Sequence, residues 1–102
     1  PSNVSARPLE SMGRNERWEI LSTPHFRLEK FHLNEPMPLS TELRRFNALF
    51  VAKGAVRLEW QASRETLESG ASCLVPSALG QYLLVPTEQT AEVLRVTAPD
   101  PR

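Results

Sequence analysis

Residues 46–60 read FNALFVAKGAVRLEW, and residues 67–76 read LESGASCLVP. The first stretch is apolar at nearly every position before Lys53-Gly54, as expected for a strand that is covered on both faces. Because glycine adopts positive φ at little cost, Lys53-Gly54 predicts a tight turn. Beyond the turn, apolar side chains alternate with charged ones as far as Trp60. This pattern predicts a second strand with one buried face, and therefore a β-hairpin.

Strand signals recur along the rest of the chain. They lie at residues 18–21, 25–33, 64–68, 71–75, 81–85 and 91–97. Residues 39–45 are ambiguous, because they fit a loop, a strand or a helical turn. About eight short strands with regular turn signals and no long helical period predict an all-β sandwich or barrel.

The segment at residues 25–33 changes phase along its length. Phe26 and Leu28 have one parity, whereas Phe31 and Leu33 have the other. A β-bulge inserts one residue and reverses the parity of the residues after it. We therefore expect a bulge near Glu29 or Lys30.

The chain length of 102 residues suits one domain. Residues 1–17 are polar and interrupted by proline and glycine, which predicts a linker or an extended arm. Residues 18–98 form the expected barrel domain. The proline-rich end at residues 99–102 is expected to be a tail.

Composition narrows the classes of partner. Lys plus Arg and Asp plus Glu each number 12, so the formal net charge is zero. Without a basic excess, neither nucleic acid nor an anionic membrane is an expected partner. The single cysteine, Cys73, cannot form an internal disulfide and is expected to be a small buried residue. No apolar run reaches the ~18 residues of a membrane helix, and no signal peptide opens the chain, so we expect a cytoplasmic protein.

The glycines and the proline of the two opening stretches have a diagnostic spacing. Gly54 ends one motif, and Gly70 and Pro76 begin another at the expected separation. This arrangement resembles the two motifs of cupins, which are small double-sheet jelly-roll β barrels. The resemblance implies the cupin fold. In most cupins it also implies a divalent metal held by inward-pointing histidines and a glutamate.

The metal-ligand positions of the cupin pattern hold other residue types here. Asn47 occupies the glutamate position, Gln81 the last histidine position, and Ala78 replaces a glycine. The first two histidine positions correspond to Thr41 and Leu43, or to Ser40 and Glu42. Since none is a histidine, we expect no metal, cofactor-binding or catalytic residue in this chain.

Other side chains are weaker candidates for a site. His25 and His32 lie seven positions apart in one expected strand, so they should face opposite sides and not share a metal. The arginines could bind the anionic group of a sugar phosphate, or could simply be solvated; they are Arg44, Arg45, Arg57 and Arg64. The rings of Trp18, Trp60 and Tyr82 could stack on a sugar or pack in a core or interface. No nucleophile elbow or phosphate loop is present in the sequence.

The order of three phrases narrows the resemblance. Residues 21–30, 46–54 and 67–76 together resemble the C-terminal domain of type I mannose-6-phosphate isomerases. The similarity covers about residues 18–97. The family interconverts mannose 6-phosphate and fructose 6-phosphate. Its zinc and its catalytic arginine segment belong to parts that precede this domain, and no match to that segment occurs here.

The resemblance implies a non-catalytic, metal-free cupin domain. Its partner would be the catalytic, zinc-binding domain of the same polypeptide, or another subunit of a homo-oligomer. An excised domain of this kind should expose an apolar patch where the partner lies. Two alternatives stay open: a stand-alone sugar-phosphate binding or regulatory module, and a small cupin enzyme with an unusual site. Whether this chain is an enzyme is therefore left undecided by the sequence.

Overall fold

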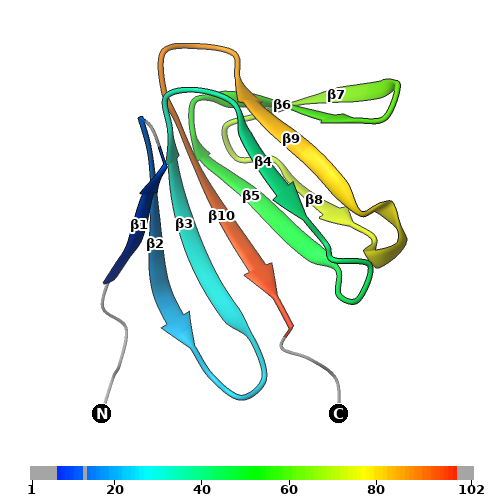
Figure 1. Ribbon diagram of the computed structural model, residues 1–102. Coiled ribbons are helices and arrows are strands. Elements are labelled where there is room, and N and C mark those ends of the chain that lie inside the picture. Colours follow the sequence, from blue (N-terminus) through cyan, green and yellow to red (C-terminus); the bar gives the residue numbers. More distant parts are fainter. Residues whose placement is uncertain (1–6, 13, 99–102) are drawn as a thin grey trace.

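The computed structural model describes residues 7–12 and 14–98, which form an all-β jelly-roll (Figure 1). The strands are β1 (Arg7–Met12), β2 (Asn15–Ser22), β3 (Arg27–Leu33), β4 (Met37–Ser40), β5 (Asn47–Lys53), β6 (Ala55–Trp60), β7 (Ser63–Glu68), β8 (Ser72–Val75), β9 (Gln81–Pro86) and β10 (Ala91–Thr97). A short 3-10 turn, Ser77–Leu79, precedes β9. The described part of the chain holds no helix that is long and apolar enough to cross a membrane.

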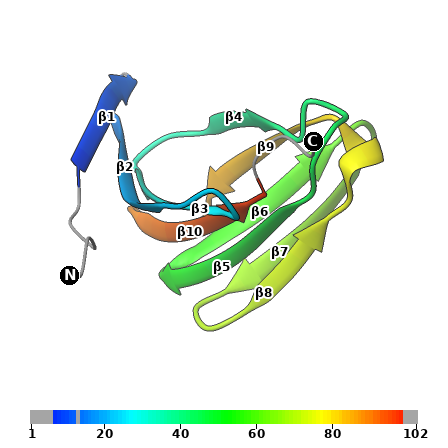
Figure 2. The ribbon, with the colours of Figure 1, turned by 90° about the horizontal axis from the view of Figure 1, so that it is seen from below.

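The strands form two antiparallel sheets. The six-stranded sheet has the order β1-β2-β3-β10-β5-β8, and the four-stranded sheet has the order β4-β9-β6-β7. The two sheets enclose the core between them (Figure 2). Alternate residues of β3, β5, β6 and β10 point into this core, as the burial of Ala91 and Val93 on β10 illustrates. The predicted all-β cupin-like barrel is confirmed.

The N-terminal boundary differs from the expected one. β1 and β2 pair as an antiparallel hairpin at the edge of the six-stranded sheet, and β2 begins before residue 18. Buried Asn15 holds the start of β2, because its Oδ1 accepts hydrogen bonds from the backbone N–H groups of Asn34 (2.7 Å) and Glu35 (3.0 Å). Because the residue that makes these contacts is polar, the hydropathy pattern gave no signal that β2 begins there. Residues 1–6 and 99–102 of the expected arm and tail lie outside the described residues.

The expected bulge in residues 25–33 is wrong. β3 pairs with β10 from Arg27 to Leu33 without any shift of register. The irregularity lies in the neighbouring strand β2, between Glu19 and Leu21. Glu29 points into the core with no exposed surface, so the apolar phase changes although the strand does not. The change of apolar phase in the sequence therefore reflects a buried charged residue and not a bulge in β3.

The central hairpin has the predicted form. Gly54 has φ of 74° between β5 and β6, and Val56 and Leu58 are buried while Arg57 is not. The ambiguous segment forms a strand only as far as Ser40 and then turns through residues 42 and 43, both of positive φ. The expectation that residues 46–52 are covered on both faces is wrong, because Phe46 and Phe50 are exposed.

Two glycines with positive φ provide a matched test of the hairpin turn. A Cβ at Gly54 would lie 2.5 Å from the Thr90 carbonyl oxygen, whereas one at Gly70 (φ 90°) would meet nothing within 4 Å. We expect Gly54→Ala to lower the free energy of unfolding by about 2–3 kcal/mol, since strain and a backbone clash add. Gly70→Ala should cost about 1 kcal/mol from strain alone. Urea unfolding measures both, and equal losses would contradict the predicted contact.

Candidate functional site

The centre of the barrel contains a buried ionic cluster. Glu29 on β3 lies between Arg17 on β2 and Arg95 on β10. Arg95 donates from Nε and Nη2 to Glu29 Oε1 (2.9 and 2.7 Å), and Arg17 donates from Nε and Nη2 to Glu29 Oε2 (3.0 and 2.6 Å). Burial alone would raise the pKa of Glu29, but the charges and hydrogen bonds of the two arginines lower it below its ordinary value of 4.5. The carboxylate is therefore ionised at neutral pH.

A second set of hydrogen bonds joins this cluster to the opposite sheet. Arg95 Nη1 donates to Asn47 Oδ1 at 3.3 Å, and the Tyr82 hydroxyl donates to the same oxygen at 2.5 Å. Burial raises the pKa of Tyr82 to about 12, although Arg95 opposes the shift. Tyr82 is thus a neutral hydrogen-bond donor. The network runs from the six-stranded sheet through Asn47 to Tyr82 on β9.

The residues at the expected metal-ligand positions do not all point into the barrel. Asn47 points into the barrel and is fully buried, in the orientation expected of a ligand position. Gln81 is exposed, and the buried residue at the start of β9 is Tyr82. The expected inward position was therefore wrong by one residue. Gly80, with φ of 79°, follows the 3-10 turn and sets the phase of β9.

The residues at the first two expected histidine positions also differ in burial and in the contacts that they make. Thr41 is buried; its hydroxyl donates to the Ser77 carbonyl (2.7 Å) and accepts from the Gly80 N–H (3.0 Å). It thereby links the turn after β4 to the turn before β9. Leu43 is 69% exposed, and Glu42 is exposed beside Arg45. Thr41 and Leu43 therefore do not share a site, whereas the alternative positions Ser40 and Glu42 line one cavity at the barrel mouth together with Gln81.

The inward-pointing groups do not fit a divalent transition metal. Such an ion prefers neutral imidazoles, thiolates and carboxylates, whereas the barrel offers an amide, a phenol and a guanidinium. The positive charge of Arg95 opposes a cation, and both oxygens of Glu29 already accept hydrogen bonds from arginines. Over residues 7–12 and 14–98, no group of three His, Cys, Asp or Glu side chains is arranged to hold a metal.

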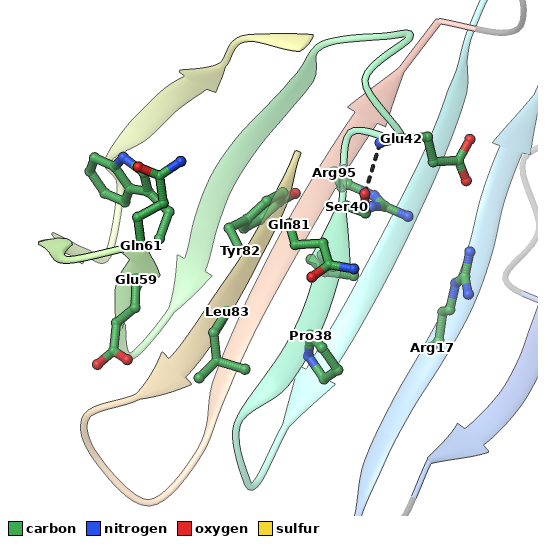
Figure 3. A pocket seen from close by; sticks show the side chains of 12 residues that line it. Arg17, Pro38, Ser40, Glu42, Glu59, Gln61, Gln81, Tyr82, Leu83 and Arg95 are labelled. Atoms are coloured by element: carbon green, nitrogen blue, oxygen red, sulfur yellow. Dashed lines mark hydrogen bonds between the residues drawn. The ribbon is translucent and has the colours of Figure 1, made fainter. Parts of the chain in front are cut away.

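A cavity opens at the barrel mouth beside this network. Its volume is about 650 Å³, within the range of small-molecule sites. Its lining includes both cluster arginines, the aromatic residues Trp60 and Tyr82, and several polar side chains (Figure 3). The residues are Arg17, Pro38, Leu39, Ser40, Glu42, Glu59, Trp60, Gln61, Gln81, Tyr82, Leu83 and Arg95. The cavity therefore combines two guanidinium groups, two carboxylates, aromatic surface and amide groups.

The arginines of this cavity are not those singled out by sequence. The expected set of residues 44, 45, 57 and 64 does not line it; Arg17 and Arg95 do. The inward orientation of Arg95 could have been predicted from the alternation along β10, because Val93 and Thr97 share its parity and are buried. An arginine at a buried position predicts a buried carboxylate on an adjacent strand. Glu29 lies directly opposite it.

The remaining single candidates lie away from the cavity. His25 is exposed, whereas His32 Nδ1 lies 3.5 Å from Glu92 Oε2. The Trp18 ring packs under Lys30, whose Nζ lies 5.8 Å from the ring centroid. Cys73 is half-buried against the core, and burial, together with the charge of Glu65, raises the pKa of its thiol. None of these residues lines the cavity.

Part of the outward-pointing surface of the six-stranded sheet, over β3, β10, β5 and β8, is apolar. Cross-strand neighbours Leu28, Val96, Ala48 and Leu74 form one continuous row over β3, β10, β5 and β8. Leu94 and Phe50 pair in the next row. Leu74 is 65% exposed, and Phe50 is 41% exposed. We refer to these six residues as the outer apolar face.

Comparison with known proteins identifies the fold and no more. No family model and no curated protein matches the sequence. Similar structures include KdgF from Halomonas sp. (TM-score 0.76, 18% identity, 92% of this chain and 88% of that one) and an RmlC-like cupin from Shewanella frigidimarina (0.75, 14%, 92% and 84%). The mannose 6-phosphate isomerase from Bacillus subtilis also matches (0.76, 13%), over 93% of this chain and 29% of that one. The chain therefore has the cupin fold.

The buried carboxylate should govern acid stability. Because its folded-state pKa is lowered, Glu29 contributes stability at pH values above 4.5 that is lost as the pH falls through the folded pKa. Glu29→Gln leaves Arg95 buried without its counter-ion, so we expect a loss of about 3 kcal/mol at pH 7 and a weaker dependence on acid. Glu68→Gln, at an exposed position of β7, is the control. Thermal melts between pH 3 and 7 measure both effects, and an unchanged acid dependence in Glu29→Gln would refute the assignment.

Proposed function

We propose that this chain is a non-catalytic, metal-independent cupin domain that acts by packing its outer apolar face against another protein surface. The observation that carries the proposal is the outer apolar face across β3, β10, β5 and β8, in which Leu74 and Phe50 are exposed and the other four side chains are partly buried. Exposed apolar patches of this kind are typical of protein–protein contact sites. The interior of the barrel supports the metal-independent part, since its donors do not suit a metal.

The resemblance to type I mannose-6-phosphate isomerases suggests the nature of the partner. The Bacillus subtilis mannose 6-phosphate isomerase contains a segment with this fold, and the chain spans less than a third of its length. We propose that the partner is the catalytic domain of the same polypeptide, which would hold the zinc, or a second subunit. The isomerase activity would belong to that catalytic domain. The cytoplasmic location stays a prediction.

A second candidate function rests on the cavity at the barrel mouth. A stand-alone binding or regulatory module would use this cavity for a sugar phosphate, with Arg17 and Arg95 as the cationic groups. The two functions are compatible in space, because the outer apolar face and the cavity lie on opposite sides of the six-stranded sheet.

Metal content and activity test the non-catalytic assignment. We expect the purified chain to contain no stoichiometric zinc after dialysis against zinc-containing buffer, and to show no turnover of mannose 6-phosphate. Elemental analysis and a coupled isomerase assay measure these quantities. Stoichiometric zinc or clear turnover by this chain alone would overturn the assignment.

Amide hydrogen exchange tests the docking role of the outer apolar face. We expect β5 and β8 to be better protected in the full polypeptide that the gene encodes, or in concentrated solution if that polypeptide is this chain alone, than in dilute solution of this chain. Leu74→Glu should abolish the added protection, because a charge would be buried at the contact. Thr66→Glu, at an exposed position of β7, should not.

Equal exchange under all of these conditions would contradict the docking role. Circular dichroism melts of the Leu74→Glu and Thr66→Glu variants establish that both remain folded. The comparison is informative because both variants introduce the same charge on a strand at the edge of its sheet.

A further inference from the structure

We propose that a second copy of this chain pairs with the open edge of the six-stranded sheet, through antiparallel contact between the β8 strands of the two copies. The pairing sets Ser72 opposite Leu74 of the partner subunit, and Cys73 opposite the partner subunit's Cys73 at the two-fold axis. It uses backbone groups at the edge of the sheet, so it goes beyond docking through the outer apolar face and does not require that docking.

The strand β8 forms one edge of the six-stranded sheet, and β1 forms the other (Figure 2). Within residues 7–12 and 14–98, β8 pairs on one side only, with β5. An unpaired strand edge presents a row of backbone N–H and C=O groups to another chain. The free side of β8 can therefore accept a further strand.

The other three sheet edges carry features that oppose pairing with another chain. β1 contains Pro8 and β4 contains Pro38, and proline has no N–H group to donate. β7 is largely exposed and presents charged side chains, which are Arg64, Glu65 and Glu68. β8, with the sequence SCLV, has neither a proline nor a charged residue. Among the described edge strands, β8 thus lacks the usual protection against pairing.

The pairing of β8 with β5 determines which backbone groups of β8 face outward. The Val51 N–H on β5 donates to the Ala71 carbonyl at 2.9 Å. Because the backbone groups of successive residues alternate between the two sides of a strand, Cys73 also faces β5. The N–H and C=O groups of Ser72 and Leu74 therefore point away from β5, toward the open side.

One two-fold register engages both outward-facing residues. It is centred on Cys73 and pairs Ser72 of each copy with Leu74 of the partner subunit. Each such antiparallel pair exchanges both of its N–H···O bonds. All of the outward donors and acceptors of Ser72 and Leu74 are then satisfied.

The neighbouring registers lose hydrogen bonds because their flanking residues are already engaged. Centred on Leu74, the pairing would set Ser72 against Pro76, which has no N–H and whose carbonyl accepts from the Leu79 N–H at 3.0 Å. Centred on Ser72, it would set Leu74 against Gly70, whose N–H already donates to a β5 carbonyl at 2.8 Å. The register centred on Cys73 is therefore the favoured one.

The side chains of β8 suit pairing with a copy of the same strand. Since the strand has no charged residue, an antiparallel copy sets no like charges opposite each other. Leu74, which is 65% exposed, would lie beside the small Ser72 side chain of the partner subunit. The formal net charge of the chain is zero, so no long-range repulsion opposes the approach of two copies. These properties favour a second copy over a charged partner strand.

The single cysteine reports the pairing in the unsubstituted chain. A non-hydrogen-bonded antiparallel pair has its Cα atoms about 4.5 Å apart, within the range of about 4.4–6.8 Å that a disulfide spans. Because the pKa of the Cys73 thiol is raised, oxidation with copper–phenanthroline is run at a pH of about 9. We expect the oxidation to join two chains through Cys73. The yield should rise between about 1 µM and 1 mM chain, in step with the mass measured by sedimentation equilibrium.

Substitutions at Ser72 test the role of the backbone edge. Ser72→Pro removes one outward N–H from each copy and should weaken association and slow cross-linking at least about 10-fold. Ser72→Ala keeps the N–H and should behave like the unsubstituted chain. Ser72→Lys, which sets a charge beside Leu74 of the partner subunit, should also weaken association, and it replaces the proline variant if that variant does not fold. Circular dichroism melts establish that each variant is folded.

Each of three results would overturn the proposal. The first is a monomeric mass at a chain concentration of about 1 mM. The second is an equal rate of cross-linking in folded Ser72→Pro and Ser72→Ala. The third is a dimer whose Cys73 thiols do not cross-link, because such a dimer would have another register or another surface.

Leu94→Glu separates edge pairing from docking. Leu94 belongs to the outer apolar face and lies on β10, away from the edge. This variant should lose the added exchange protection of the docked state and retain cross-linking through Cys73. Loss of cross-linking in a folded Leu94→Glu variant would contradict the independence of the edge. Retained exchange protection without any cross-linking of the unsubstituted chain would refute edge pairing and leave the docking role in place.

Discussion

The carboxylate of Glu29, held between two arginines, is the constraint on which the rest of the barrel depends. A buried ionised group is costly unless it is paired and its hydrogen bonds are satisfied. Here Arg95 contacts one carboxylate oxygen and Arg17 the other. Because the three residues lie on adjacent strands, this geometry is available only when β2, β3 and β10 keep their observed register. A slip of one residue would turn Glu29 outward and leave Arg95 buried without its counter-ion.

The same cluster determines which chemistry the barrel can perform. Arg95 extends from Glu29 to Asn47, whose side-chain oxygen also accepts the Tyr82 hydroxyl. These residues occupy inward positions at which a cupin could place metal ligands. They connect the two sheets by hydrogen bonds instead and leave cationic groups beside the mouth. The interior is thereby unsuited to a divalent metal ion.

The sequence predicted features that depend on local chemistry and missed those that depend on a partner far along the chain. The Lys53-Gly54 turn and the alternation through Leu58 were predictable, since both follow from the residues themselves. The inward position of Glu29 was mistaken for a bulge because its counter-ion Arg95 is 66 residues away. Gln81 was expected to point inward because the motif spacing takes account only of the number of residues. Which residues of β9 point inward is determined instead by Gly80, which follows the 3-10 turn.

The two proposed surfaces use alternate residues of the same strands, and this has a structural consequence. On β10, Leu94 and Val96 belong to the outer apolar face, and Arg95 between them points into the barrel. A protein docked on the outer face would restrict β10 without obstructing the cavity, because the sheet separates the two sides. It would also exclude water from the outer side of the strand that positions Arg95. Docking would therefore restrict the strand that positions Arg95, while the cavity keeps contacts of its own.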